Sequence, residues 1–230
     1  TIDQVSWSTS FPFEPGIAMT LGSLDASLND SSIYWCAATS SYGIGDLGTP
    51  GQPNDTCPDP ALSVDTLGTG DLVISEIMSN PTQVADYRGE WFEIYNNSGF
   101  DINLNGLDVS STGNAGFSIN DNVVVNDGAY AYFAVNANST RNGGLTDIDF
   151  VYSYANLSFG RRDDLTLSVS GTTIDTVTIG SSHPEGVGTS LSLNTLSATT
   201  NDNASSWCES SSTYGSGDAG TPGASNDSCP

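Results

Sequence analysis

Apolar residues along the chain come in short alternating runs, separated by clusters of Gly, Asn, Asp, Ser and Pro. Alternation of this kind predicts β-strands joined by turns. The expected strands are 72–78, 89–96, 102–109, 122–125, 129–135, 149–154, 164–169, 173–179 and 190–193. A last strand is expected at Trp207. So many short, closely spaced strands are typical of an all-β protein with an immunoglobulin-like β-sandwich.

The two ends of the chain repeat each other. Trp35-Cys36 recurs as Trp207-Cys208, and segment 42–51 recurs as 214–223, in both cases 172 positions later. Over the 58 paired positions 27 are identical, and the alignment needs no gap. A repeat on this scale indicates repeated domains.

This repeat divides the chain into three parts. Residues 71–230 are expected to form one complete domain, and residues 1–58 to form the C-terminal third of another. Segment 59–70, which contains Pro60 and a Gly-Thr-Gly run, is predicted to be the linker.

The N-terminal third lacks the strands that 71–172 supply to the complete domain. Its apolar side chains would then lie on an open edge, which folded proteins avoid; they are Ile2, Val5, Trp7, Met19, Leu21 and Trp35. We therefore expect strands from another copy of the chain, or from an adjacent repeat of a longer chain, to complete it.

The four cysteines form two equivalent pairs, Cys36/Cys57 and Cys208/Cys229. We expect one disulfide within each copy, because a chain with a single histidine cannot complete a zinc site with two cysteines per copy. Disulfides predict an oxidising compartment, and hence a secreted or cell-surface protein. Seven Asn-X-Ser/Thr triplets offer possible glycosylation sites, at Asn29, Asn54, Asn96, Asn138, Asn156, Asn203 and Asn226.

The chain is strongly acidic, with 4 Lys+Arg against 27 Asp+Glu and a net charge of −23. This charge excludes nucleic acid as a partner, and the chain has no apolar run long enough to insert into a membrane. A solvated acidic surface is the simplest interpretation, and calcium binding is the alternative. Clustered oxygen ligands for Ca²⁺ are offered by Asp121, Asp127, Asp147 and Asp149, although ordinary turns use the same residues. No other cofactor is expected.

The order of motifs resembles the opening of the lamin tail domain family. It runs from Ile-Ser-Glu-Ile at 74–77 through Asn80-Pro81 and Gly-Glu-Trp-Phe-Glu-Ile-Tyr-Asn at 89–96 to Ile-Asn-Leu-Asn-Gly-Leu at 102–107. The resemblance covers 71–230 and, as a C-terminal third, 1–58. It implies an immunoglobulin-like sandwich that serves as a scaffold or accessory module, and the cysteines and acidity favour the secreted microbial branch.

Few residues suggest chemistry. The only histidine, His183, aligns with Phe11 in the other copy, so the fold does not need a histidine there. Three glutamates, Glu76, Glu90 and Glu93, fall inside strands that look buried. A glycosidase pair is conceivable, but acids bonded to backbone donors or paired with Arg88 are favoured.

We therefore expect no enzymatic activity. The predicted function is that of an extracellular structural protein of tandem lamin-tail-like domains, forming a filament, stalk or surface coat. The alternative is an adhesive or carbohydrate-binding accessory module of a larger secreted hydrolase.

Overall fold

The computed structural model describes residues 2–57, 61–160 and 162–230. The chain divides into two compact units, Thr1–Pro60 and Ala61–Pro230. The larger unit is all-β and carries the immunoglobulin-like sandwich.

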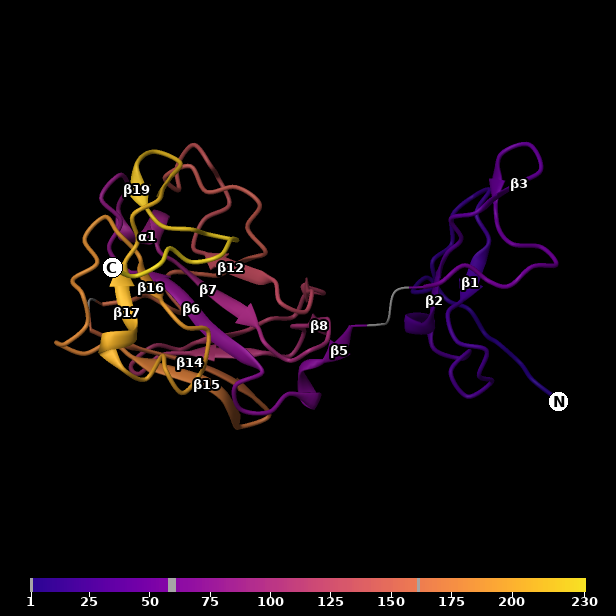
Figure 1. Cartoon of the computed structure of the whole chain (residues 1–230), viewed down its shortest axis with the longest axis horizontal. Helices are drawn as coiled ribbons and strands as arrows, with labels where there is room; N and C mark the ends of the chain where they lie inside the picture. The colour runs from indigo at the N-terminus through magenta and orange to yellow at the C-terminus, as the bar shows by residue number, and fades with distance from the viewer. Residues whose placement is uncertain (1, 58–60, 161) are drawn as a thin grey trace. The chain divides into compact units, whose positions relative to one another are not determined.

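A six-stranded sheet forms one layer of the larger unit (Figure 1). All neighbouring strands are antiparallel except β12 and β13. In spatial order they are β13 (Phe150–Val151), β12 (Tyr130–Ala134), β7 (Trp91–Asn96), β6 (Leu72–Met78), β16 (Leu191–Leu193) and β17 (Trp207–Glu209). The central pair, β6 and β7, is thus followed by β16 and β17 from the C-terminal part of the chain.

The other layer is a four-stranded sheet, with several smaller elements around it. Its strands, in order, are β10 (Phe117–Ser118), β9 (Asp108–Ser110), β14 (Asp164–Val169) and β15 (Thr172–Thr178). A three-stranded sheet contains β11 (Val124–Val125), β8 (Ile102–Asn103) and β5 (Leu62–Ser63). The remaining elements are the hairpin of β18 (Thr213–Tyr214) and β19 (Asp218–Ala219), helix α1 (Asp86–Gly89), and the 3-10 turns η2 (Val64–Thr66) and η3 (Ala204–Ser206).

The main core lies between the two large sheets. Alternate residues of β14 are buried, as expected for a strand with one face on a core. The rings of Phe92 and Phe133 stack with their centres 4.8 Å apart. Strand β6 is buried on both faces, because a second cluster around Met78 and Trp91 covers the face that points away from the main core.

Two expectations about the larger unit were wrong in detail. The linker predicted over 59–70 is not a linker from residue 61 onwards: β5 pairs with β8, and Val64 is buried in the main core. Residues 59 and 60 lie outside the described residues. The strand predicted over 102–109 is divided into β8 and β9, because Gly106 adopts a positive φ of 95° that breaks the extended chain.

From β1 (Met19–Leu21) onward, the smaller unit has the same local elements as the larger one has from β16 onward, but residues 2–6, the counterparts of β15 residues 174–178, form no strand. Strand β1 pairs with β2 (Trp35–Ala37) in the register that β16 and β17 use 172 positions later. The hairpin of β3 (Ser41–Tyr42) and β4 (Asp46–Leu47) corresponds to β18 and β19, and the 3-10 turn η1 (Ser32–Tyr34) to η3.

Across the part of the chain that the structure describes, no helix has the length and apolar character needed to cross a membrane.

Candidate functional site

Two glutamates stand side by side on the central strands of the six-stranded sheet. Glu76 on β6 and Glu93 on β7 are paired in the antiparallel register, so their side chains lie on the same face. This face also carries Met78 and Trp91, and it points away from the main core. Both glutamates are fully buried, so each carboxylate needs hydrogen-bond donors from the protein.

The donors to Glu76 all come from the C-terminal part of the chain. The hydroxyls of Ser190, Ser192 and Ser210 donate to Oε1, the last two at 3.1 and 2.8 Å. The Thr221 amide donates to Oε1 at 3.0 Å, and the Thr221 hydroxyl donates to Oε2 at 2.7 Å. Glu76 therefore ties β16, the residue after β17 and the segment after β19 to strand β6.

Glu93 holds the next part of the same segment. Its Oε2 accepts from the Gly223 amide at 2.7 Å, and its Oε1 accepts from the Ser75 hydroxyl at 2.8 Å. Burial, and then the neighbouring Glu76 carboxylate, raise the pKa of Glu93 well above its usual value. Two like charges side by side in a buried site are unfavourable, and this repulsion adds to the larger effect of burial on the pKa of Glu93.

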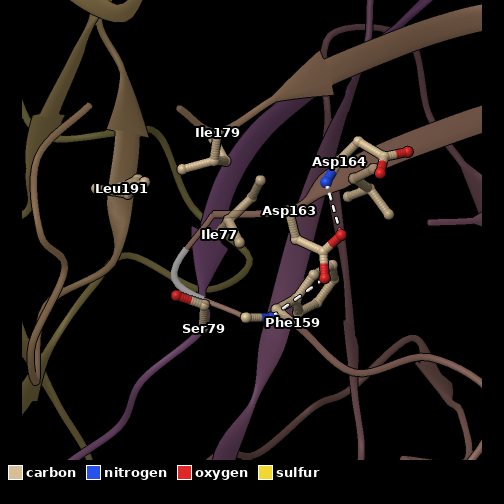
Figure 2. Close-up of a pocket in the computed structure, with 9 residues that line it drawn as sticks. Ile77, Ser79, Phe159, Asp163, Asp164, Ile179 and Leu191 are labelled. Carbon is tan, nitrogen blue, oxygen red and sulfur yellow. Dashed lines mark hydrogen bonds between the residues drawn. The ribbon is translucent and has the colours of Figure 1, made fainter. Parts of the chain in front are cut away.

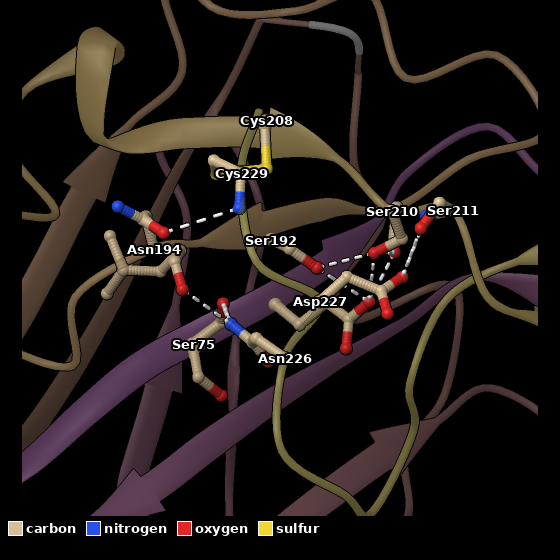
Figure 3. The surroundings of a disulfide bond; sticks show 12 residues. Ser75, Ser192, Asn194, Cys208, Ser210, Ser211, Asn226, Asp227 and Cys229 are labelled. Atoms are coloured by element: carbon tan, nitrogen blue, oxygen red, sulfur yellow. Dashed lines mark hydrogen bonds between the residues drawn. A yellow bond between two sulfur atoms is a disulfide. The ribbon is translucent and has the colours of Figure 1, made fainter.

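The C-terminal segment is fixed further along its length. The Asn226 amide nitrogen donates to the Ser75 carbonyl at 2.8 Å and to the Leu193 carbonyl at 2.9 Å. The disulfide Cys208–Cys229 then ties the end of the chain to β17 (Figure 3). We call residues 213–229 the C-terminal clasp, because they close over the acid pair.

The start of the C-terminal clasp packs closely on Trp91. The Trp91 indole donates to the Tyr214 hydroxyl at 3.0 Å. A Cβ at Gly220 would lie 2.8 Å from the Trp91 ring, so only glycine fits there. Asp218 is 2% exposed and accepts from the Thr82 amide and hydroxyl at 3.0 and 2.6 Å. The sequence carried no signal for this long-range contact.

The third strand-borne acid, Glu90, lies just before β7. It is fully buried, and its Oε2 accepts from the Phe159 amide at 3.0 Å. Burial, assisted by Asp86 and Asp163, raises the pKa of Glu90 to about 8.

Each acid thus accepts from at least one backbone amide, as predicted, and Glu76 and Glu93 also accept from side-chain hydroxyls. Their predicted alternative partner, Arg88, places its guanidinium 5.1 Å from the centre of the Tyr87 ring. No ion pair joins it to these acids within the described chain. Because Glu76, Glu90 and Glu93 are all shielded from solvent, this geometry offers no carboxylate pair to a polysaccharide.

The single histidine has a local role. The His183 Nδ1 accepts a hydrogen bond from the Gly180 amide at 3.0 Å, and burial lowers the pKa of the imidazole. A ring that accepts at Nδ1 is neutral, and here it stabilises a turn.

The aspartates predicted as possible calcium ligands are not brought together. Within 2–57, 61–160 and 162–230, no group of three or more His, Cys, Asp or Glu side chains could hold a metal ion. Asp121 is exposed, Asp127 accepts from the Gly99 amide, Asp147 adopts a φ of 57° in a bend, and Asp149 accepts from the Tyr132 amide. These residues serve turns and strand ends.

At three of the seven predicted glycosylation sites the side chain is buried or partly buried, and its nitrogen donates hydrogen bonds inside the fold. Asn96 is fully buried and donates to three carbonyls, Asn29 is buried and donates to Asp3, and Asn226 donates to two carbonyls. The exposed side chains are Asn54, Asn138, Asn156 and Asn203.

Both predicted disulfides are present. Cys36–Cys57 and Cys208–Cys229 each have a Cα–Cα distance of 5.6 Å. Disulfides form and persist in oxidising compartments, so the two bonds indicate such an environment.

The sandwich and its acid-anchored clasp define an immunoglobulin-like module. The family model for the lamin tail domain matches residues 66–181, just over half of the chain. The chain therefore belongs to the lamin tail domain family, a non-enzymatic immunoglobulin-like family. A search of curated proteins found no match to this chain.

Proposed function

We propose that this chain is a non-catalytic extracellular structural protein, whose tandem lamin-tail-like domains form a filament, stalk or surface coat. The observation that carries this proposal is the recurrence, 172 positions apart, of one disulfide-closed segment with the same strand register. Repeated modules, each closed by its own disulfide, are suited to a protein that extends over a distance and resists mechanical load.

A structural role also fits the use of the chain's strongest chemical groups. The buried acids hold the C-terminal clasp, and the histidine holds a turn. Groups that are desolvated and bonded in this way are unavailable to bind and turn over a substrate. The extracellular part of the proposal is supported by the disulfides and the net charge of −23, which keeps a secreted protein soluble.

Electron microscopy of the native material, purified from the medium or the cell surface, tests this function. We expect extended strings or a regular coat of particles. Treatment with a thiol reductant provides the matched comparison, and we expect it to disorder the assemblies. Discrete, compact particles in the untreated sample, or recovery of the protein only from the reducing cell interior, would contradict the proposal.

A second candidate is an adhesive or carbohydrate-binding module. It is favoured by an exposed aromatic pair, Tyr87 and Tyr154, whose rings are 6.4 Å apart. Exposed aromatic rings of this kind can pack on sugar faces. Titration with soluble polysaccharides would show saturable binding that Tyr87→Ala removes. The exposed Phe100 is the matched control, and Phe100→Ala should leave such binding unchanged.

A further inference from the structure

The smaller unit exposes the face that its counterpart in the larger unit buries. Trp7 is 64% exposed, whereas Ile179, which lies 172 positions later, is 8% exposed. Ile2 is fully exposed and its counterpart Ile174 fully buried. The elements from β1 and from β16 onward are the same in the two units, but residues 2–6 form no strand, whereas their counterparts lie in β15, which pairs with β14 of the half-domain. The difference is thus the half-domain that pairs with these residues and covers them.

In the larger unit the cover comes from the half-domain 71–172. Figure 2 shows Ile179 and Leu191 around a small hollow with Ile77 of β6. Phe159 and Leu165 also line this hollow. In the smaller unit the counterparts of Ile179 and Leu191 line an open apolar hollow together with neighbouring aromatic rings; its apolar residues are Trp7, Phe11, Phe13 and Met19.

The strand edge of the smaller unit is open in the same place. Strand β16 lies between β17 and β6, with Leu191 opposite Ile77 and Ser192 opposite Glu76. Its counterpart β1 pairs with β2 alone among the described strands. An unpaired edge of this kind is a template for the addition of another strand.

Two polar side chains of the smaller unit, Asp46 and Asn54, are also available to bind a partner. Asp46 is exposed, whereas its counterpart Asp218 binds the Thr82 backbone and hydroxyl. The Asn54 amide nitrogen donates to the Leu21 carbonyl at 3.0 Å, as Asn226 does to Leu193. Asn226 makes a second bond, to the Ser75 carbonyl of β6.

We propose that residues 2–57 form a docking surface for a second lamin-tail half-domain of the 71–172 type. The partner's counterpart of β6 would add to the free edge of β1, its apolar pocket would cover Trp7 and Met19, and its backbone would bind Asp46 and Asn54. The proposal deepens the proposed function, on whose tandem domains it rests.

The partner is related to residues 71–172 of this chain but differs from them. Ser190 and Ser210, which donate to Glu76, are replaced in the smaller unit by Ala18 and Ala38. A buried carboxylate at the position of Glu76 would lose both hydroxyl donors. Trp7 is also larger than its counterpart, so the matching pocket must be wider. These differences weaken docking onto a separate copy of this chain, so the test attaches the half-domain covalently, where a high effective concentration compensates for the mismatch.

The test extends the full chain at its N-terminus. Residues 61–172 are placed directly before Thr1, which reproduces the junction between residues 172 and 173. Hydrogen exchange of the peptide that contains 19–21 is compared with that in the unextended chain. We expect exchange to slow at least about tenfold, because β1 gains a neighbouring strand. Trp7→Asp should abolish this slowing, whereas Ile44→Asp should not, since the counterpart of Ile44 is the polar Ser216.

A second variant of the extended chain tests the match between the two halves. Ala18→Ser with Ala38→Ser restores the two hydroxyls, so we expect a further slowing of about tenfold or more. Unchanged exchange at 19–21 in both extended chains would overturn the proposal. Slowing that grows with concentration in the unextended chain would overturn the choice of partner, because a second copy would then be the occupant. Neither measurement needs an assembly, so failure here is distinguishable from the absence of native filaments.

Discussion

The buried carboxylate of Glu76 offers a sharp test of what holds the C-terminal clasp. Replacement of Glu76 by Gln keeps the side-chain shape and removes the charge. The new amide would keep one acceptor oxygen toward the serine hydroxyls and place its NH₂ group where Oε2 accepts from the Thr221 hydroxyl. At least one charge-assisted hydrogen bond is therefore lost, and the others become bonds to a neutral acceptor.

The size of the effect follows from two opposing contributions. A hydrogen bond to a charged group contributes about 1.5–3 kcal/mol. Loss of the charge also relieves the repulsion that raises the pKa of Glu93, and this returns part of that free energy. We expect a net loss of about 2 kcal/mol, which in a domain of this size lowers Tm by about 4–8 °C.

Calorimetry of the full chain measures this change in the transition of the larger unit. Asp121→Asn is the matched control, because it removes one charge from an exposed side chain, and we expect it to change stability by less than about 0.5 kcal/mol. The Glu76→Gln variant should also weaken the attachment of the C-terminal clasp to strand β6, so amide hydrogen exchange at residues 221–226 should become faster. A Tm that is unchanged or higher in Glu76→Gln would refute the reasoning, since repulsion between the acids would then outweigh their donors.

Two further predictions concern the other buried acids. The native pKa of Glu90 is raised to about 8 by burial, so its contribution to stability is fully present below about pH 4.5 and is lost as the pH rises toward 8. The urea midpoint of the larger unit should therefore fall as the pH rises over this range. Glu90→Gln keeps an acceptor for the Phe159 amide but does not titrate, so its midpoint should depend less on pH. An equally steep pH dependence in the variant would contradict this prediction. Asp218→Asn should lower the free energy of unfolding by about 1–3 kcal/mol, because three donors face the Asp218 carboxylate. Asp46→Asn changes the exposed counterpart, so the same denaturation assay should show a loss of less than about 0.5 kcal/mol.

The local parts of this fold could be predicted from the sequence. Strands 72–78 and 164–169 are found at the predicted residues, because their apolar runs and turn-forming boundaries are strong. The cysteine pairs could be predicted because the repeat gives each pair the same spacing. The linker prediction failed because Gly and Pro content describes chain flexibility, whereas burial of Val64 and pairing of β5 depend on a surface supplied by distant residues.

The partners of the buried acids could not be predicted. The hydroxyls of Ser190 and Ser210 meet Glu76 across separations of 114 and 134 residues. Nothing in the local pattern distinguishes these serines from the many that lie in turns. One signal was available: at the repeat positions these two serines are Ala18 and Ala38. The strand register of the segment is the same in both copies, so these two hydroxyls are not needed for its local structure.

The two units together show which contacts of the terminal segment form without a half-domain. The Thr39 and Ser40 amides donate to Asp55 at 2.7 and 2.9 Å, just as the corresponding amides of the larger unit donate to Asp227. The strand register and the disulfide are likewise the same in both units. The segment is thus organised by its own local bonds. Docking of a half-domain then requires further backbone ordering mainly at residues 2–6, whose counterparts form strand β15, and the apolar area covered over the rest of the segment contributes more directly to binding.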